Sequence, residues 1–334
     1  MKALVLVGKA EGVVYMPHYA QPTLAQGQVL VKMQAAALNH RDIWIAQGKY
    51  AGIVYPTILG SDGVGEVVQV ADNAAADWLG KRVIINPNTH WGDSPKAQSR
   101  TYAVLGLPQN GTLAEYVAAA ADRLHLAPDT LNTAQAAALP LAGMTAYRAL
   151  FVRAAAQRGE RVLINGIGGG VALMAMQLAL AAGCEVYVTS SNDQKIARAM
   201  TIGAAGGANY TGHGWQKDFV RTHGEMDVVI DSAGGSGFAA LIDTLGAGGR
   251  LALYGGGNGL INDLSPQKIF WKQLSILGST MATDAEFADM LAFVQQHHIL
   301  PIIDQIFTLP NGKAAFEYMD SGAQFGKIVV TMDV

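Results

Sequence analysis

The residues with the clearest chemical meaning form a glycine turn, Gly166 to Gly170. An apolar stretch at 161–165 precedes the turn, and an apolar helical pattern at 171–182 follows it. A tight turn lets the backbone approach phosphate groups, and a helix N-terminus offers unpaired N–H groups with partial positive charge. This order is typical of a site for a dinucleotide pyrophosphate. The expected contacts are Gly166, Gly169, Gly170 and the N–H of Val171.

The end of the next expected strand, 185–190, distinguishes between the two nicotinamide cofactors. A site for NAD usually ends this strand with Asp or Glu, which binds the ribose hydroxyls. Here the strand ends in Thr-Ser-Ser-Asn, and Asp193 is placed to cap the following helix. The pattern therefore predicts NADPH. The alternative is that Lys195 is only a solvated charge on the helix and does not bind the cofactor. The expected donors to the 2′-phosphate are Ser190, Ser191, Lys195 and Tyr210.

Glycines also follow two later strands of the same series. Ser232 stands after the fourth strand, and Gly255 and Gly256 stand after the fifth. Because ligands of such sheets bind beyond the carboxyl ends of the strands, these residues are expected near the ribose and nicotinamide. Some of the glycines are equally explained by turn geometry alone.

The elements that position these residues fall into two patterns. Residues 1–128 show short apolar runs separated by Gly and Pro, which predicts a β-rich domain. From residue 133 strands and helices alternate, with six strands in all. The fold class is therefore α/β, with a doubly wound parallel sheet in the second pattern. A helix at 284–297 and closing strands, including one at 326–332, return the chain to the β-rich domain.

Bulk composition limits the function classes. The net charge is −3 and no basic run occurs, so binding of nucleic acid or of an anionic membrane has no electrostatic support. A single cysteine excludes an intramolecular disulfide and any zinc site built from several cysteines. No apolar helix reaches the length of a membrane span, and a cytoplasmic location is expected.

The chain as a whole resembles the medium-chain dehydrogenase/reductases, most closely their zinc-free quinone oxidoreductase branch. The segments that carry the resemblance are 38–42, 59–63, 111–116, 138–147, the glycine turn, 276–280 and 325–329. The resemblance implies a GroES-like catalytic domain at 1–128 and 283–334, a Rossmann NADP-binding domain at 129–282, and a homodimer. It also implies that Thr145, Thr280 and Lys327 contribute to the cofactor site between the domains.

The zinc-dependent branch of this family provides a direct comparison at three positions. Its members carry Cys, His and Cys where this chain has Asn39, Ser61 and a residue near Leu141. Catalytic zinc requires three Cys, His or acidic ligands and an open position. The loop at 86–111 also lacks the four cysteines of that branch's structural zinc. The sequence therefore predicts no bound metal.

Without a metal, hydride transfer needs an acceptor that is already electrophilic. The expected activity is NADPH-dependent reduction of quinones or of α,β-unsaturated or activated carbonyl compounds. Asn39, Arg41 and Ser61 are candidates to polarise the carbonyl, although each also has a structural explanation in a cap, an ion pair or a turn. Two rival functions stay open: a zinc-type alcohol dehydrogenase with unusual ligands, and a non-catalytic NADPH-binding protein.

Overall fold

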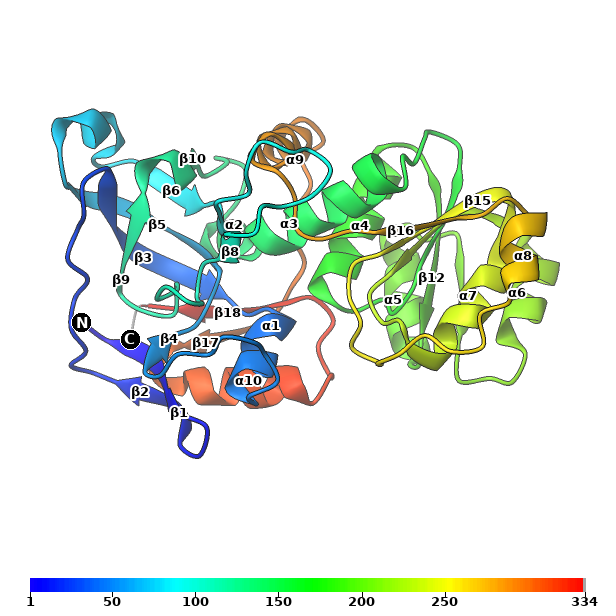
Figure 1. Ribbon diagram of the computed structural model, residues 1–334, viewed down its shortest axis with the longest axis horizontal. Coiled ribbons are helices and arrows are strands. Elements are labelled where there is room, and N and C mark those ends of the chain that lie inside the picture. Colours follow the sequence, from blue (N-terminus) through cyan, green and yellow to red (C-terminus); the bar gives the residue numbers. More distant parts are fainter. Residues whose placement is uncertain (333–334) are drawn as a thin grey trace. The chain divides into compact units, whose positions relative to one another are not determined.

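The computed structural model describes residues 1–332, and the chain divides into two units (Figure 1). Unit 1 consists of Met1–Ala142 and Thr283–Val334, and unit 2 of Gly143–Ala282. Residues 129–142, expected in the Rossmann domain, belong instead to unit 1. The reason is that helix α2 (Thr133–Ala138) contacts strands β3 and β5 of the unit 1 sheet.

Unit 1 is built mainly of antiparallel strands. Its strands are β1 (Ala3–Gly8), β2 (Gly12–Met16), β3 (Gln28–Ala37), β4 (Thr57–Ile58), β5 (Asp62–Val70), β6 (Arg82–Ile85), β7 (Asn88–Thr89), β8 (Ala103–Val104), β9 (Tyr116–Ala120), β10 (Leu124–Leu126), β17 (Ile303–Thr308) and β18 (Lys327–Thr331). Its helices are α1 (His40–Ala46), α2, α9 (Asp284–Gln296) and α10 (Gly312–Asp320). Helix α3 (Pro140–Tyr147) spans the boundary to unit 2.

The main sheet of unit 1 brings the two ends of the chain together. Its strand order is β10-β6-β5-β3-β18-β17, with β9 also paired to β3. Strand β3 is buried along almost its whole length because it pairs with β5, β9 and β18. As a result the first residue of β18, Lys327, lies beside the ends of β3 and β5.

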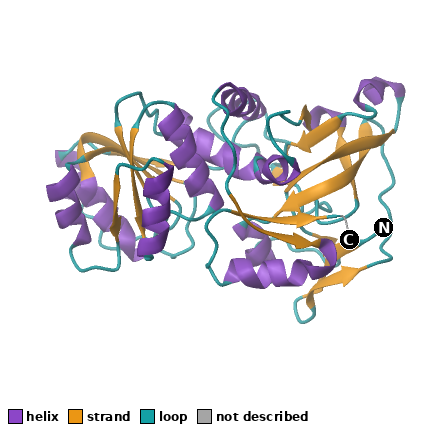
Figure 2. Cartoon of the chain, turned by 180° about the vertical axis from the view of Figure 1, so that it is seen from behind, coloured by secondary structure: helices purple, strands orange, loops and turns teal. Residues whose placement is uncertain are grey.

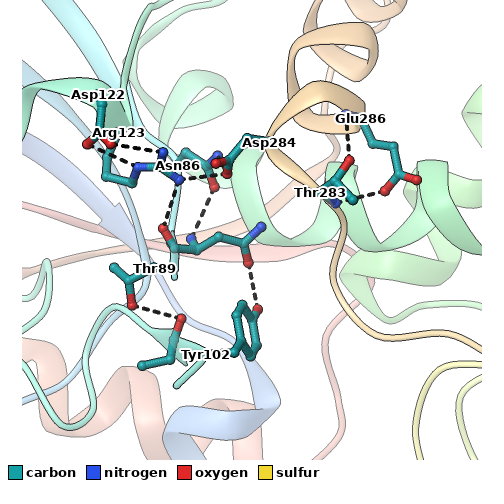
Figure 3. A network of polar contacts seen from close by, with 10 residues as sticks. Asn86, Thr89, Tyr102, Asp122, Arg123, Thr283, Asp284 and Glu286 are labelled. Carbon is teal, nitrogen blue, oxygen red and sulfur yellow. Dashed lines mark hydrogen bonds and ion pairs between the residues drawn. The ribbon is translucent and has the colours of Figure 1, made fainter. Parts of the chain in front are cut away.

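A polar network connects the start of α9 to the rest of unit 1 (Figure 3). The carboxylate of Asp284 accepts hydrogen bonds from Asn86 Nδ2 at 3.0 Å and from Arg123 Nη1 at 2.6 Å. Nearby, the Tyr102 hydroxyl donates to Asn88 Oδ1 at 2.6 Å. Most of the segment expected as a loop at 86–111 is irregular, and the two-residue strands β7 and β8 pair within it.

Unit 2 has the predicted doubly wound parallel sheet. Its six strands follow the order β13-β12-β11-β14-β15-β16 and pair in parallel throughout. Figure 2 shows helices on both sides of this sheet. The strands are β11 (Arg161–Ile164), β12 (Glu185–Ser190), β13 (Gly206–Asn209), β14 (Met226–Asp231), β15 (Leu245–Leu253) and β16 (Ser275–Gly278). The helices are α4 (Gly170–Ala181), α5 (Asp193–Ile202), α6 (Trp215–His223), α7 (Phe238–Thr244) and α8 (Pro266–Trp271).

Two helices of unit 2 show how residue pattern determines burial. Helix α4 is apolar on nearly all sides, and seven of its residues are buried, which is typical of a helix inside a core. Helix α5 is amphipathic and buries only Ile196 and Ala199. Within residues 1–332, no helix has the length and apolar character to cross a bilayer.

Candidate functional site

Asp42 joins the first helix of unit 1 to the turn before β5. Its fully buried carboxylate accepts the backbone N–H of Asn39 at 2.8 Å and that of Gly60 at 3.1 Å. Burial raises the pKa of Asp42, and the nearby charge of Arg41 acts in the opposite direction. Because these two bonds fix the start of α1, Asn39 and Arg41 hold defined positions beside Ser61.

A buried ion pair lies at the centre of this region. Lys327 Nζ donates to Asp62 Oδ2 at 2.9 Å, to Asn39 Oδ1 at 2.7 Å and to the Leu38 carbonyl at 2.8 Å. Asn39 Nδ2 donates to the same Asp62 oxygen at 2.9 Å, and the backbone N–H of Leu141 donates to Asp62 Oδ1 at 2.8 Å. Lys327 and Asp62 side chains are 5% and 0% exposed. We call Asn39, Asp62 and Lys327 the polar cluster.

The polar cluster changes the expected role of Lys327. An ammonium has three donors, and all three are used by Leu38, Asn39 and Asp62. No donor is left for a cofactor, so the expected contact of Lys327 with the cofactor is not supported by its geometry. The sequence did not single out Asp62 as the partner of Lys327, since the two residues are 265 positions apart.

The polar cluster does not fit a catalytic zinc. Asn39 and Leu141 stand where thiolates would be needed, and the carboxylate of Asp62 is already paired with an ammonium. A divalent cation at this place would be repelled by the Lys327 charge and would have to displace it from Asp62. Across residues 1–332, no three His, Cys, Asp or Glu side chains are grouped so that they could hold a metal ion.

Arg41 and Ser61 form a second arrangement next to the polar cluster. Arg41 Nη1 donates to Ser61 Oγ at 2.6 Å and to the Leu105 carbonyl at 2.9 Å. Ser61 Oγ donates its own proton to the Leu105 carbonyl at 2.7 Å. Ser61 is fully buried. Because its one hydroxyl proton is donated to Leu105, the hydroxyl has no proton left for a substrate. Ser61 therefore positions Arg41, which differs from its expected role in polarising a carbonyl.

In unit 2, the glycine turn lies between β11 and α4 as predicted. Gly166 and Gly168 have φ values of 72° and 122°, a region that favours glycine, so these two positions serve the turn itself. Gly169 is the N-cap residue of α4, with φ −73° and no side-chain cap. A Cβ atom added at Gly169 would meet nothing within 4 Å. An open space therefore lies at Gly169, next to the N–H groups of Gly170 and Val171 at the start of α4. We call this open space the cradle.

A network of side-chain hydrogen bonds lies next to the glycine turn. Asn165 Nδ2 donates to Asp231 Oδ1 at 2.7 Å, and Asn165 Oδ1 accepts from Thr189 Oγ1 at 2.6 Å. The buried Asp231 also accepts the backbone N–H groups of Ala233 and Gly234, at 3.0 and 2.9 Å. These bonds link the carboxyl ends of β11, β12 and β14. This network was not predicted from the sequence, although Asn165 and Asp231 each end an expected strand.

The end of β12 carries the residues expected to recognise a 2′-phosphate. Ser190 is buried, and its Oγ accepts the backbone N–H of Asn192 at 3.2 Å. Ser191 is exposed, Lys195 lies in the first turn of α5, and Tyr210 directly follows β13 with 40% of its surface exposed. Asp193, the carboxylate nearest to the strand end in sequence, accepts from Asn209 Nδ2 at 3.0 Å. Ser191 and Tyr210 are thus exposed here, Lys195 is half-buried, and Asp193 is exposed but paired with Asn209.

The two glycines that follow β15 differ in the space available for a side chain. A Cβ atom at Gly255 would lie 2.4 Å from the Ser232 carbonyl oxygen, so glycine is required there by close packing. A Cβ atom at Gly256 would meet nothing within 4 Å. Elsewhere in unit 2, Thr145 Oγ1 donates to Met281 Sδ at 3.7 Å, and the neighbouring Thr280 is exposed.

Comparison with known proteins agrees with this architecture. The alcohol dehydrogenase GroES-like domain matches residues 25–129, and the zinc-binding dehydrogenase domain matches residues 170–296. A zinc-type alcohol dehydrogenase-like protein, YogA, of Leptosphaeria maculans is 33% identical over 93% of this chain and 92% of its own length. The chain belongs to the medium-chain dehydrogenase/reductase superfamily. It is an oxidoreductase of that superfamily, which uses nicotinamide cofactors.

Solved structures of the superfamily cover the whole chain. A structure described as an NAD-dependent alcohol dehydrogenase superposes with a TM-score of 0.92 and 31% identity, covering 100% of both chains. The quinone oxidoreductase of Thermus thermophilus, also solved with NADPH, gives a TM-score of 0.81 and 26% identity, covering 99% of this chain and 100% of its own. The GroES-like and Rossmann folds are thus confirmed for this chain.

Proposed function

We propose that this protein reduces quinones or α,β-unsaturated or activated carbonyl compounds with NADPH and without a metal. The observation that carries the proposal is the polar cluster, because Asn39, at a ligand position of the zinc branch, is a carboxamide held by the buried ammonium of Lys327. Without a Lewis acid, a saturated alcohol has nothing to take up its alkoxide charge, whereas a conjugated carbonyl accepts hydride directly.

When bound, the reduced nicotinamide supplies a hydride, which is one proton with two electrons. In an enone the β-carbon would accept the hydride as a C–H bond, the C=C π pair would form a double bond from the α-carbon to the carbonyl carbon, and the C=O π pair would move to the oxygen. A proton from solvent then completes the saturated ketone. The protein's task is to hold the acceptor and to stabilise the developing charge on that oxygen.

Asn39 is the residue best placed to donate to that oxygen. Its Oδ1 accepts from Lys327 and one Nδ2 proton goes to Asp62, so charged partners fix which way the amide points. The second Nδ2 proton has no partner among residues 1–332 and is available to an acceptor. Lys327 and Asp62 act as positioning residues, since they touch Asn39 and have no free groups directed to a substrate.

The proposal is tested by NADPH oxidation with a panel of small quinones, enones and saturated aldehydes, and with primary alcohols in the reverse direction. Turnover with quinones or enones, and little or none with alcohols, is expected. Alcohol oxidation that requires stoichiometric zinc would instead identify a zinc-type alcohol dehydrogenase. Tight NADPH binding with no turnover across the panel would identify a non-catalytic binding protein.

The preference for NADPH is tested at the end of β12. Ser191 is exposed there, whereas Ser190 is buried, so a carboxylate is better introduced at Ser191. Ser191→Asp with Lys195→Ala removes a cation and adds a group that binds ribose hydroxyls and repels a phosphate. The ratio of kcat/KM for NADPH to that for NADH should fall by about 100-fold, the sum of two effects of roughly 1.4 kcal/mol each. An unchanged ratio would place the 2′-phosphate elsewhere.

The homodimer is part of the same proposal. Strand β16 is the edge of the unit 2 sheet, and Ile276 on it is 38% exposed. Unpaired backbone groups on an edge strand can pair with a second copy across a two-fold axis. Light scattering after gel filtration should give twice the chain mass of 35.1 kDa. Ile276→Lys should yield monomers, because it brings like charges together across the axis; a wild-type monomer would contradict the proposal.

A further inference from the structure

Arg41 forms no ion pair with an acidic residue of the described chain, in contrast to four other arginines. Four other arginines of the described chain form ion pairs: Arg123, Arg161, Arg221 and Arg250. Arg41 is half-buried, and no carboxylate of residues 1–332 lies within ion-pair distance of it. The adjacent Asp42 accepts only backbone N–H groups. The guanidinium therefore forms no ion pair with the described residues, although the charge of Asp42 is nearby.

Two sides of the Arg41 guanidinium are already occupied. Its Nη1 edge donates to Ser61 Oγ and the Leu105 carbonyl. Its face is covered by the Tyr50 ring, whose centroid lies 5.5 Å from Arg41 Cζ. These contacts use Nη1 and fix the plane of the group. Arg41 is thus a rigid guanidinium, and its position is set by neutral partners.

The remaining edge of the guanidinium carries Nε and Nη2. Nε is buried and makes no hydrogen bond within the described chain. The hydrogen bonds of Arg41 to described residues use Nη1, not Nη2. A buried donor without a partner costs about 1–3 kcal/mol, so such a group usually marks a ligand site or a strained position. The Nε and Nη2 protons of arginine point in one direction and match the two oxygens of a carboxylate.

We propose that this free edge of Arg41 binds a carboxylate carried by the acceptor. The preferred substrates would then be unsaturated or keto acids, with Asn39 at the reacting carbonyl and Arg41 at the acid group. This inference rests on the proposed function, because it names the substrate class of the same site. The same edge also fits a phosphate of the cofactor, so the experiment must separate the two oxyanions.

The test uses β-acetylacrylic acid and its methyl ester, which share one enone and differ in charge. NADPH oxidation is measured with both compounds for the wild type, Arg41→Gln and Arg41→Lys. Arg41→Gln should lower the acid-to-ester ratio of kcat/KM by about 10- to 100-fold, as expected for a lost charge-assisted pair. Most of the change should appear in KM for the acid. Arg41→Lys should keep part of the preference, because lysine retains the charge and loses the fork.

Lys81→Gln serves as the matched control, since it removes an exposed positive charge of the same unit. It should leave the ratio unchanged. The Kd for NADPH is measured on every variant by fluorescence, and a melting curve confirms folding. If Arg41→Gln does not fold, the lysine variant alone carries the test through its reduced ratio.

Four results would overturn the proposal. An acid-to-ester ratio unaffected by Arg41→Gln would show that the acceptor's acid group does not meet Arg41. A higher Kd for NADPH with an unchanged ratio would assign the edge to a cofactor phosphate. Reduction of the ester with no preference for the acid in the wild type would leave the reductase intact and reject the acid-binding role, whereas no turnover of either compound would reject both.

Discussion

Lys327→Met is expected to lower the free energy of unfolding by about 3–5 kcal/mol, the usual cost of leaving a buried charge without its partner. The variant leaves the fully buried Asp62 with only Asn39 Nδ2 and the Leu141 N–H as partners. It also releases Asn39 Oδ1, so the amide that we place at the acceptor loses its fixed orientation. Denaturant unfolding is followed by tryptophan fluorescence, to which Trp44, Trp78 and Trp91 of unit 1 contribute together with the two tryptophans of unit 2.

Two comparisons make this prediction specific. Lys313→Met, at an exposed position of α10, should change the stability by less than about 0.5 kcal/mol. The double variant Asp62→Asn with Lys327→Met removes both charges and should be more stable than the sum of the single losses implies. Additive losses in this cycle would show that the two side chains do not interact as the structure places them.

Gly169→Ala is expected to raise the Kd for NADPH by about 10- to 100-fold, corresponding to one lost charge-assisted hydrogen bond to the pyrophosphate. The methyl group would occupy the open cradle before α4, where a Cβ meets nothing within 4 Å. The backbone at Gly169 has φ −73°, which alanine adopts without strain. The free energy of unfolding should therefore stay within about 0.5 kcal/mol of the wild type.

Gly237→Ala is the matched control, because it lies in unit 2 with φ −74° and an added Cβ there also meets nothing within 4 Å. It should affect neither stability nor NADPH binding. Gly166→Ala provides the opposite contrast, since its φ of 72° makes alanine costly by about 1–2 kcal/mol. If Gly169→Ala bound NADPH as tightly as the wild type, the cradle would not be the pyrophosphate site.

Much of the fold follows from local patterns in the sequence. Strand β12 has the predicted bounds, 185–190, and the helix predicted at 171–182 corresponds to α4 within one residue at each end, since each has a clear apolar run. The boundary near residue 129 was misplaced because the alanine-rich segment of α2 gives no sign of which sheet it packs against. Helix α10 was not predicted, as its apolar residues are interrupted by charged ones.

The site was only partly predictable, for a different reason. The glycine turn depends only on residues that are neighbours in the chain, so the sequence alone predicted its position between β11 and α4. The polar cluster depends on contacts between residues far apart in the chain, and Lys327 gave no local sign that its donors end on Asp62 and Asn39. Similarly, the proton of Ser61 is used by the distant Leu105 carbonyl, which no spacing in the sequence indicates.

The most direct test of metal-free hydride transfer combines kinetics with metal analysis on one sample. The purified protein is dialysed against a strong chelator, its zinc content is measured, and NADPH-dependent reduction of a quinone and an enone is assayed before and after zinc is added back. We predict zinc well below one equivalent and the same kcat/KM in all samples. Activity that is lost with the chelator and restored by one equivalent of zinc would contradict the account.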